Sequence, residues 1–580
     1  MASLRSRSSR AAAAQPDSET STSPTSTAAS KSFASSNKAA GARAPLTKST
    51  FAKRQPAEGG APFTLDDIKR AIPKHCFERP LYKSFGYLFY DLAVIAVIVF
   101  CSLFFKQAAI RIASLFSIVF GLSQEPLAAL VADSALAGAA APYASAAFAL
   151  PGSGSVLSLF GETAHALFSQ PLLAALASPQ LFVYCAALTA LTVTGILAQG
   201  AVMTGVWVIG HECGHGGFSD NRMIGDVVGL IFHTMLFVPY YSWAITHRTH
   251  HSNNANIDLD EVHVPEHINY YMPLSAHGAL HHDKHTAGEA PVEGAAPSAM
   301  AFLSEVNKIL SDFNLFHRCI STFFTVTIGW ILYLTINASG RRYENKSRFP
   351  VNHFNPDAPI FRPQERLQVT LSTVALLAWF FILYRIIAAS SLTIVAVHFL
   401  FPYLVVQYWL VVITLLQHTH TALPRYSTAS WDYVRGALAT VDRDYGAVWN
   451  WTLHNINDTH VVHHLFSYMP HYHAMEATEA VKELLGDWYV RTEDDKPAFG
   501  VLRSLWKSIR ECNFVAEDDH PALALADSAI RGLKSGASAE AVAAEVEAAK
   551  EKAFAEGPHA GGRNASKEVY WFRTIDVAKE

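Results

Sequence analysis

The sequence predicts an all-α integral membrane protein, with about four transmembrane helices and several interfacial helices under a cytosolic histidine-rich cap. Three observations support this fold class. Only 16% of the 580 residues are charged, against a usual quarter, while half are hydrophobic. Five apolar runs have the length that a helix needs to cross a bilayer. Histidine is unusually frequent, with 27 residues, many of them in clusters, which indicates a metal site.

The first segment, residues 1–60, is rich in Ser, Ala and Thr and carries nine Lys or Arg against three acidic residues. Such a composition cannot build a core, so we predict a disordered tail. Its basic bias fits a cytosolic location, and a plastid transit peptide of similar composition is the alternative. The next stretch, TLDDIKRAIP at 64–73, begins with the capping-box residues Thr64 and Asp67 and ends at Pro73. It predicts a short amphipathic helix before the membrane.

The membrane domain is expected over residues 61–490. Its long apolar runs are 84–105, 180–210, 319–338, 367–389 and 392–416. The second run contains no charged residue and exceeds the ~20 residues that a crossing requires. Its helix should therefore continue out of the bilayer and carry His211 at its end. A shorter run at 227–241 contains Pro239, so we expect it to lie in the interface.

Three segments carry a weaker pattern. The Ala-rich stretch from about 120 to 178 is expected to form a lumenal loop with short helices. The polar stretch from about 265 to 310 contains HGALHHDKH at 277–285, which we interpret as a solvated loop. Residues 491–580 are expected to form a soluble C-terminal extension that ends in an Ala/Glu helix, SAEAVAAEVEAAKEKAFAEG.

Three histidine clusters carry the chemistry. They are HECGH (His211, His215), HRTHH (His247, His250, His251) and HVVHH (His460, His463, His464). On a helix, residues three or four apart share a face, so each cluster can direct its imidazoles to one point. Eight imidazoles exceed the four ligands of a zinc ion and suit two metal ions.

Two other classes of protein remain open at this point. The motif HExxH, with Glu212 as general base, predicts a membrane zinc metalloprotease. A metal-binding or transport protein without catalysis is the second alternative, and its ligands should lie in the middle of the membrane. His233 and His398 stand alone in apolar runs and are interpreted as core residues.

A shared site requires that all three clusters lie on one face of the membrane. Two crossings before His211 return the chain to the side of the basic N-terminus, which the positive-inside rule places in the cytosol. Between His251 and His460 the number of crossings must then be even. We therefore expect the run 319–338 to be interfacial, and the runs 367–389 and 392–416 to form a transmembrane hairpin.

The order and spacing of these boxes, HxxxH, HxxHH and HxxHH, resemble the membrane-bound fatty acid desaturase family. More narrowly, GVWVIGHECGHGGFSD, VPYYSWAITHRTHHSN, QHTHTALPRY and HNINDTHVVHHLFSYMPHYHAMEAT are similar to the endoplasmic-reticulum Δ12 (omega-6, oleate) desaturases. The resemblance covers roughly residues 62 to 490. Gly216 is a departure, because many close relatives have a third histidine there and omega-3 desaturases tend to have glycine.

The resemblance implies a Δ12 fatty acid desaturase that converts oleoyl to linoleoyl chains with O2 and two electrons. An omega-3 desaturase or a fatty acid hydroxylase of the same superfamily is the alternative. The electrons would come from cytochrome b5 and NADH-cytochrome b5 reductase, and the acyl chain would be linked to phosphatidylcholine or to CoA. The protein would lie in the endoplasmic reticulum membrane as a multi-pass protein with its boxes and N-terminus in the cytosol, a plastid membrane being the alternative.

The resemblance also implies a diiron cap with two Fe2+ ions. Its ligands would be His211, His215, His247, His250, His251, His460, His463 and His464. A ninth ligand is expected before the third box, where we prefer His418 to His420, and His454 is a further candidate. No catalytic residue is expected beyond the ligands. Carboxylates should orient the imidazoles. Among Glu212, Asp258, Asp260, Asp442, Asp444 and Asp458 we favour Glu212 and Asp458.

Overall fold

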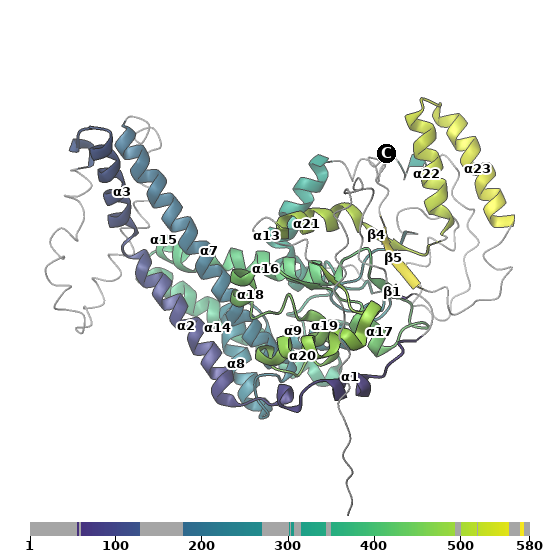
Figure 1. Cartoon of the computed structure of the whole chain (residues 1–580), viewed down its shortest axis with the longest axis horizontal. Helices are drawn as coiled ribbons and strands as arrows, with labels where there is room; N and C mark the ends of the chain where they lie inside the picture. Colours follow the sequence, from purple (N-terminus) through teal and green to yellow (C-terminus); the bar gives the residue numbers. More distant parts are fainter. Residues whose placement is uncertain are drawn as a thin grey trace, which may run out of the picture. The chain divides into compact units, whose positions relative to one another are not determined.

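The computed structural model describes residues 55–56, 60–127, 178–268, 301, 303–304, 306, 315–343, 350–492, 500–518, 520–555 and 569–573. Most of the expected tail (1–60), most of the expected lumenal loop and the whole of HGALHHDKH lie outside the described residues. The described part of the chain is mainly helical, with two small β-sheets (Figure 1). The predicted all-α membrane architecture is confirmed, and the small sheets add to it.

The N-terminal approach has the predicted helix, α1 (Leu65–Ala71), with its capping box. The Thr64 side chain accepts from the Asp67 N–H at 3.2 Å, and the Asp67 carboxylate accepts from the Thr64 N–H at 2.8 Å. A 3₁₀ turn, η1 (Lys74–Phe77), follows Pro73. Both elements pack against α20 (His471–Leu485), which buries Ile68 and Cys76. Figure 1 shows α1 beneath α20.

Five helical segments of the described chain are long and apolar enough to cross a membrane. They are α2 (Leu81–Ser102), α7 (Pro179–His215), α13 (Leu315–Ile336), Pro363–Ala389, which contains η3 (Pro363–Glu365) and α14 (Arg366–Ala389), and Leu392–His418, which contains α15 (Leu392–Val395), a π-helical turn η4 (Ala396–Leu400) and α16 (Phe401–His418). These segments coincide with the five predicted runs. The interfacial position of α13 stays a prediction. By length and composition α13 could also cross the membrane, and nothing else in the structure tests its position.

The apolar run at 227–241, whose place in the interface stays a prediction, is divided at Pro239. Helix α8 (Arg222–Met235) ends before it, and α9 (Tyr240–Asn253) begins directly after it, at an angle of 107° to α8. Proline has no N–H to donate, so it suits the start of a helix and not its interior. The bend folds α9 back against α7, and α14 packs on both α8 and α9.

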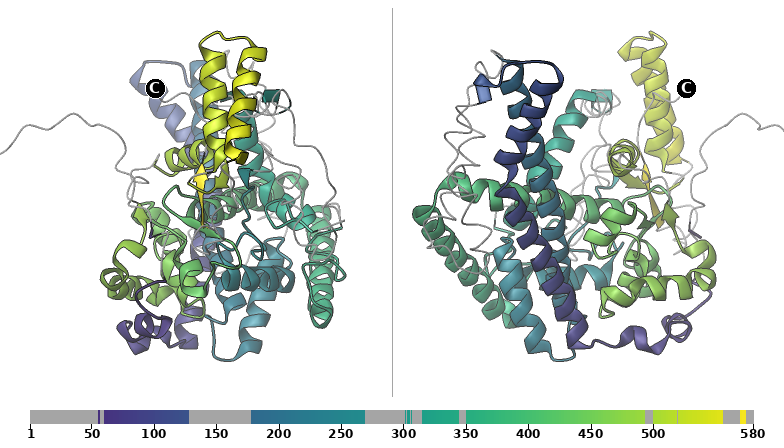
Figure 2. Two further views of the ribbon diagram at one scale, coloured as in Figure 1. Left: turned by 90° about the vertical axis from the view of Figure 1, so that its right-hand side faces the viewer. Right: turned by 60° about the vertical axis from the view of Figure 1, so that its left-hand side comes forward.

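Helix α7 is the central element of the membrane part. It has 37 residues, or about 55 Å at 1.5 Å per residue, so it extends well past a ~30 Å bilayer core. Helices α2 and α3 (Phe105–Val119) run alongside it (Figures 1 and 2). The sequence pattern assigned no helix to α3, whose Ala109 and Ala113 are fully buried in one cluster with Tyr184 and Leu188 of α7. Alanines four residues apart lie on one face of α3 and let it pack closely against α7. A face of such small residues lacks the large apolar side chains by which a buried helix is recognised in a sequence.

The described elements that follow α16 form the polar part of the molecule. These are β1 (Pro424–Tyr426), α17 (Tyr433–Leu438), β2 (Asp442–Arg443), α18 (Ala447–Thr452), α19 (His460–Leu465), α20, η5 (Gly486–Trp488), β3 (Arg491–Thr492), α21 (Gly500–Glu511), β4 (Phe514–Ala516), α22 (Pro521–Lys534), α23 (Ala539–Ala555) and β5 (Val569–Arg573). The predicted C-terminal Ala/Glu helix is α23, which pairs with α22 as a hairpin (Figure 2).

Two small sheets connect the chain beyond residue 490 to the part that precedes it. Strand β5 lies between β1 and β4, antiparallel to both, with Trp571 opposite Pro424 on one side and Ala516 on the other. Strand β3 pairs in parallel with β2. Residues 491–580, the predicted soluble extension, therefore supply strands that pair with β1 and β2. Both of these strands lie between the second and third histidine clusters in the sequence.

Candidate metal centre

The three histidine clusters lie on three helices, as their spacing predicts. His211 and His215 occupy the last turns of α7, three histidines lie on α9, and the third cluster forms most of α19. Helix α7 ends at Gly216, whose φ of +78° is left-handed backbone that glycine adopts without steric cost. A Cβ there would also come within 3.3 Å of an Arg222 side-chain nitrogen. The helix terminus thus gives a local reason for glycine at the position where many relatives have histidine.

Five imidazoles from all three clusters converge in a first group. One ring nitrogen of each lies within 4.8 Å of the others in the set His211, His215, His247, His251 and His463. His247 is at its centre, because its Nε2 lies 2.9 Å from Nε2 of His211 and 3.2 Å from Nε2 of His251. The helix ends therefore bring together side chains that are up to 252 residues apart in the sequence.

A second group lies beside the first and includes a histidine from α16. Nitrogens of His250, His418 and His464 lie within 4.8 Å of one another. The Nε2 atom of His418 is 3.3 Å from that of His250 and 3.1 Å from that of His460, so His460 belongs to this group. The rings of His251 and His464 stack at 4.0 Å between centroids and join the two groups. Nine imidazoles are thus divided five and four.

Several of these imidazole rings have a buried nitrogen without a hydrogen-bond partner. Ring nitrogens of six of the nine have no hydrogen-bond partner in the described structure: His211, His215, His251, His418, His463 and His464. Burying an unpaired polar atom is unfavourable, and a metal ion could satisfy the free Nε2 atoms of His215, His463 and His464. In His211, His251 and His418 the free atom is Nδ1, whereas their Nε2 atoms meet the neighbouring imidazoles. Burial also lowers the pKa of His460 to about 3, and burial followed by the neighbouring imidazoles holds the pKa of His463 and His464 well below its usual value. These three rings are therefore neutral, which is the form that ligates metals.

Carboxylates reach the cluster at two places. Asp260 lies 2.8 Å from Nδ1 of His250, and both side chains are 1% exposed. Burial raises the pKa of Asp260, but His250 and the Val262 N–H together lower it below its ordinary value, so the group is a carboxylate at neutral pH. Glu212 lies 3.4 Å from Nδ1 of His211, and its second oxygen accepts the N–H of His471 at 3.0 Å.

Asp458, which the sequence favoured, occupies a different place. Its carboxylate accepts from the side chains of Asn450 at 2.9 Å and Asn455 at 3.1 Å, inside the loop that leads to α19. Within the described residues no hydrogen bond joins it to an imidazole. Asp260 is the residue that sequence reasoning ranked too low, and nothing in its local pattern separates it from its acidic neighbours.

The remaining candidate histidines have other partners. His420 accepts the Ala422 N–H at 3.1 Å and belongs to neither group. His454 lies 2.7 Å from the carboxylate of Asp91, so it pairs with the one charge in the apolar run of α2. His233, expected in the core, is fully buried and donates to the Trp207 carbonyl oxygen at 3.0 Å. His398, with the same expectation, lies in the π-helical turn before α16.

The surroundings of Glu212 bear on the protease alternative. A metalloprotease base must reach a water molecule on the metal, whereas Glu212 is 2% exposed and one of its oxygens is committed to the start of α20. The nitrogen-only groups of five and four also exceed what a single catalytic zinc binds. The geometry favours two metal ions close together, near the polar end of a transmembrane helix.

Comparisons with known proteins agree with this arrangement. Residues 186–494 match the family model described as fatty acid desaturase. The chain is 39% identical over 458 residues to the Delta(12)-acyl-lipid-desaturase of Punica granatum, an overlap of 79% of this chain and 88% of that protein. It is 37% identical over 474 residues to the endoplasmic reticulum omega-6 fatty acid desaturase isozyme 2 of Glycine max, covering 82% and 91% of the two chains. It is also 36% identical over 458 residues to the oleoyl-12-hydroxylase of Ricinus communis, covering 79% and 88%. The chain therefore belongs to the fatty acid desaturase family, whose members are oxidoreductases that act on acyl lipids in membranes.

Proposed function

We propose that this protein is a Δ12 (omega-6) desaturase that converts oleoyl chains to linoleoyl chains with O2 and two electrons. The observation that carries the proposal is the convergence of nine imidazoles, in groups of five and four, at the polar end of α7; seven are buried, and His215 and His247 are partly exposed. Relatives named as Δ12 or omega-6 desaturases, 36–39% identical over most of the chain, support the choice of the Δ12 position.

Two iron ions are the cofactors that this donor set fits. The group of five would hold one ion, and His250, His418, His460 and His464 would hold the other. Iron bound there would activate dioxygen for the removal of hydrogen from an unactivated methylene, a reaction beyond the reach of any side chain. Asp260 would keep the Nδ1–H of His250 as a hydrogen-bond donor, so that Nε2 of the same ring stays free to ligate.

Apolar side chains lie beside one side of the imidazoles. The indole of Trp243 stacks on His247 at 4.6 Å between centroids, and Trp207 lies 5.4 Å from Trp243 and 5.5 Å from His211. Both indoles belong to a large buried cluster that also contains Trp330 and Trp409. An acyl chain is apolar throughout, so a site bounded by such side chains suits it.

The electron donor and the location follow the same proposal. Cytochrome b5, reduced by NADH-cytochrome b5 reductase, would supply the two electrons at the cytosolic face. The protein would lie in the endoplasmic reticulum membrane with the histidine clusters and the N-terminus in the cytosol, and relatives named as endoplasmic reticulum enzymes support this location. The substrate would be an oleoyl chain linked to phosphatidylcholine or to CoA.

The deciding experiment is the fatty-acid profile of a yeast strain that makes only monounsaturated lipids. The strain would express the chain, its His250→Ala variant, or a His317→Ala control, since His317 is an exposed residue of α13. We expect linoleate from the chain and the control, and none from His250→Ala at equal protein levels.

Other products would contradict the proposal and would identify a different activity. A triene formed only from added linoleate would identify an omega-3 desaturase. A hydroxylated oleate would place the chain with the hydroxylase relative. No new lipid, together with peptide hydrolysis that survives His250→Ala, would identify a zinc metalloprotease.

A further inference from the structure

A second cluster of metal-ligating side chains lies outside the nine imidazoles, where η1 meets α20. His75 and Cys76 come from η1, and His473 and Glu476 come from α20. The two residues of α20 are three positions apart, so they share one face of the helix. One ligand atom of each of the four residues lies within 4.8 Å of the other three.

The contacts within this cluster already converge. Nε2 of His75 lies 2.9 Å from a carboxylate oxygen of Glu476, and the sulfur of Cys76 lies 3.8 Å from the same nitrogen. The rings of His75 and His473 meet edge to face at 5.4 Å between centroids. An exposed histidine–carboxylate pair alone adds little stability, and it gives no reason for a thiol and a second imidazole to face the same point.

Exposure divides the four residues into two pairs. Cys76 is completely buried and His473 is 8% exposed, so packing fixes both of them. The side chains of His75 and Glu476 are each 50% exposed, so an ion from solvent can reach the cluster between them. The site therefore has two fixed donors and two donors that can close over a metal.

We propose that His75, Cys76, His473 and Glu476 bind a zinc ion that fastens η1 to α20. One thiolate, two imidazoles and one carboxylate are all zinc ligands, and four of them complete a tetrahedral structural site. Bonds of 2.0–2.3 Å place tetrahedral ligands about 3.3–3.8 Å apart. The present separations within 4.8 Å thus need only small side-chain rotations.

Charge also fits this ion. The thiolate and the carboxylate together neutralise Zn2+ when the two imidazoles are neutral. Without metal, burial and then Glu476 raise the pKa of the Cys76 thiol to about 11, so the free thiol is protonated at neutral pH. Zinc binding would displace that proton, as it does at other thiolate sites.

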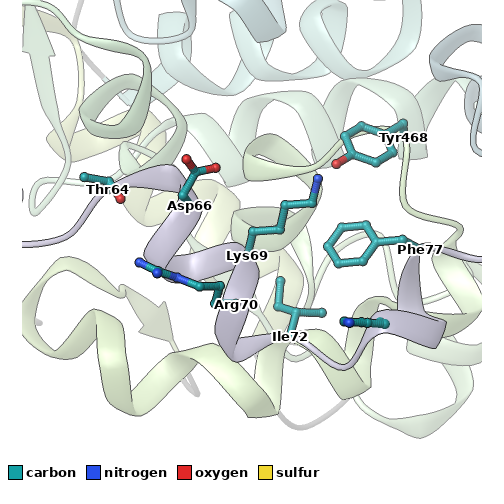
Figure 3. Close-up of a pocket in the computed structure, with 8 residues that line it drawn as sticks. Thr64, Asp66, Lys69, Arg70, Ile72, Phe77 and Tyr468 are labelled. Atoms are coloured by element: carbon teal, nitrogen blue, oxygen red, sulfur yellow. The ribbon is translucent and has the colours of Figure 1, made fainter. Parts of the chain in front are cut away.

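The site would brace a region that faces the solvent. Lys74 and Phe77, which flank the η1 pair, line an open groove of about 770 Å³ together with residues of α1. Figure 3 shows Lys69 of α1 directed toward Tyr468 and Phe77, and the amine lies 5.4 Å from the Phe77 ring centroid. A bound zinc would fix one wall of this groove to the helix that follows the third histidine cluster.

The test is metal analysis of the purified full-length protein in detergent, after equilibration with Zn2+ and removal of loosely bound ions. We expect about one zinc per chain in addition to iron. Cys76→Ser and Glu476→Gln should lose that zinc while their iron content stays unchanged. Glu479→Gln is the matched control, because Glu479 lies one turn further along α20 and pairs with Lys482.

Cobalt gives a second measurement that isolates this site. Co2+ bound by Cys76 should show a thiolate-to-cobalt charge-transfer absorption, which the imidazole groups cannot produce because they contain no thiolate. The absorption should be present in the wild-type chain and in Glu479→Gln, and absent in Cys76→Ser. A wild-type chain without zinc and without this absorption would overturn the proposal, as would equal zinc in Cys76→Ser. Neither result depends on desaturase activity, so this inference and the proposed function fail separately.

Discussion

Replacement of Asp260 by asparagine tests how a single buried carboxylate supports the metal centre. Asp260 lies 2.8 Å from Nδ1 of His250, and both side chains are almost completely buried. Asparagine keeps the size and one oxygen acceptor but removes the negative charge that makes the opposite ring nitrogen a better ligand. Loss of such a partner typically lowers metal affinity 10–100-fold, which is about 1.4–2.7 kcal/mol.

The assay is competition for iron between the purified chain and a soluble chelator of known affinity. Asp260→Asn should release iron at a chelator concentration about 10–100 times lower than the wild-type chain does. Asp258→Asn is the control, because the Asp258 carboxylate accepts from the N–H and the hydroxyl of Thr428 at 3.0 and 2.8 Å. If Asp260→Asn held iron as tightly as the wild type, or if both variants weakened equally, the orienting role of Asp260 would be refuted.

Three further predictions concern histidines with different partners. His418→Ala should abolish diene formation in yeast, whereas His420→Ala should still form the diene. The His420→Ala variant should lose only about 1 kcal/mol of stability, because it lacks the hydrogen bond to the Ala422 N–H. Equal diene formation by the two variants would show that His418 is not part of the metal centre. His454→Ala should lower the unfolding free energy by about 3–5 kcal/mol in denaturant titrations, because it leaves the Asp91 charge buried and unpaired. Replacing both His454 and Asp91 with leucine should recover part of this loss. Burial lowers the pKa of His353 from 6.5 to about 3, so the unfolded chain takes up a proton below pH 6.5 and the folded chain does not. Between pH 7 and pH 5 the wild type should therefore lose about 2 kcal/mol more stability than His353→Gln, and parallel pH profiles would contradict this reasoning.

The parts of the fold that sequence could predict are those encoded locally. Long apolar runs with few or no charges predicted the membrane helices. The helical spacing of the three clusters predicted that each would present its imidazoles on one face, because that geometry depends only on the backbone of one helix. Thr64 and Asp67 predicted the start of α1 for the same reason.

The parts that sequence left open depend on contacts between distant segments. His418 and His420 are two residues apart, and α16 ends between them, so only the first is carried on the helix toward His250 and His460. Asp260 and Asp458 are both acidic residues near a cluster, and only the folded loops determine which one meets an imidazole. The strands of the small sheets are too short, at two to five residues, for their pattern to stand out from loops.

The short helix α19 shows how the polar part of the molecule is built. Helix α19 has six residues, far fewer than the ~12–15 that an isolated helix needs to be even marginally stable in water. All six are buried, and three of them are histidines with low pKa values and, in two cases, unpartnered ring nitrogens. Contacts with other segments therefore hold this turn in place. Asp442 accepts the Val461 N–H at 2.9 Å, the Tyr433 hydroxyl donates to the His464 carbonyl oxygen at 3.0 Å, and the apolar residues of α19 pack in one buried cluster with α20. By contrast, the distant end of α7 packs against α3 through apolar side chains that require no ligand. Apolar packing thus supports one end of α7, and we expect that metal–imidazole bonds would join α7, α9, α16 and α19 at the other.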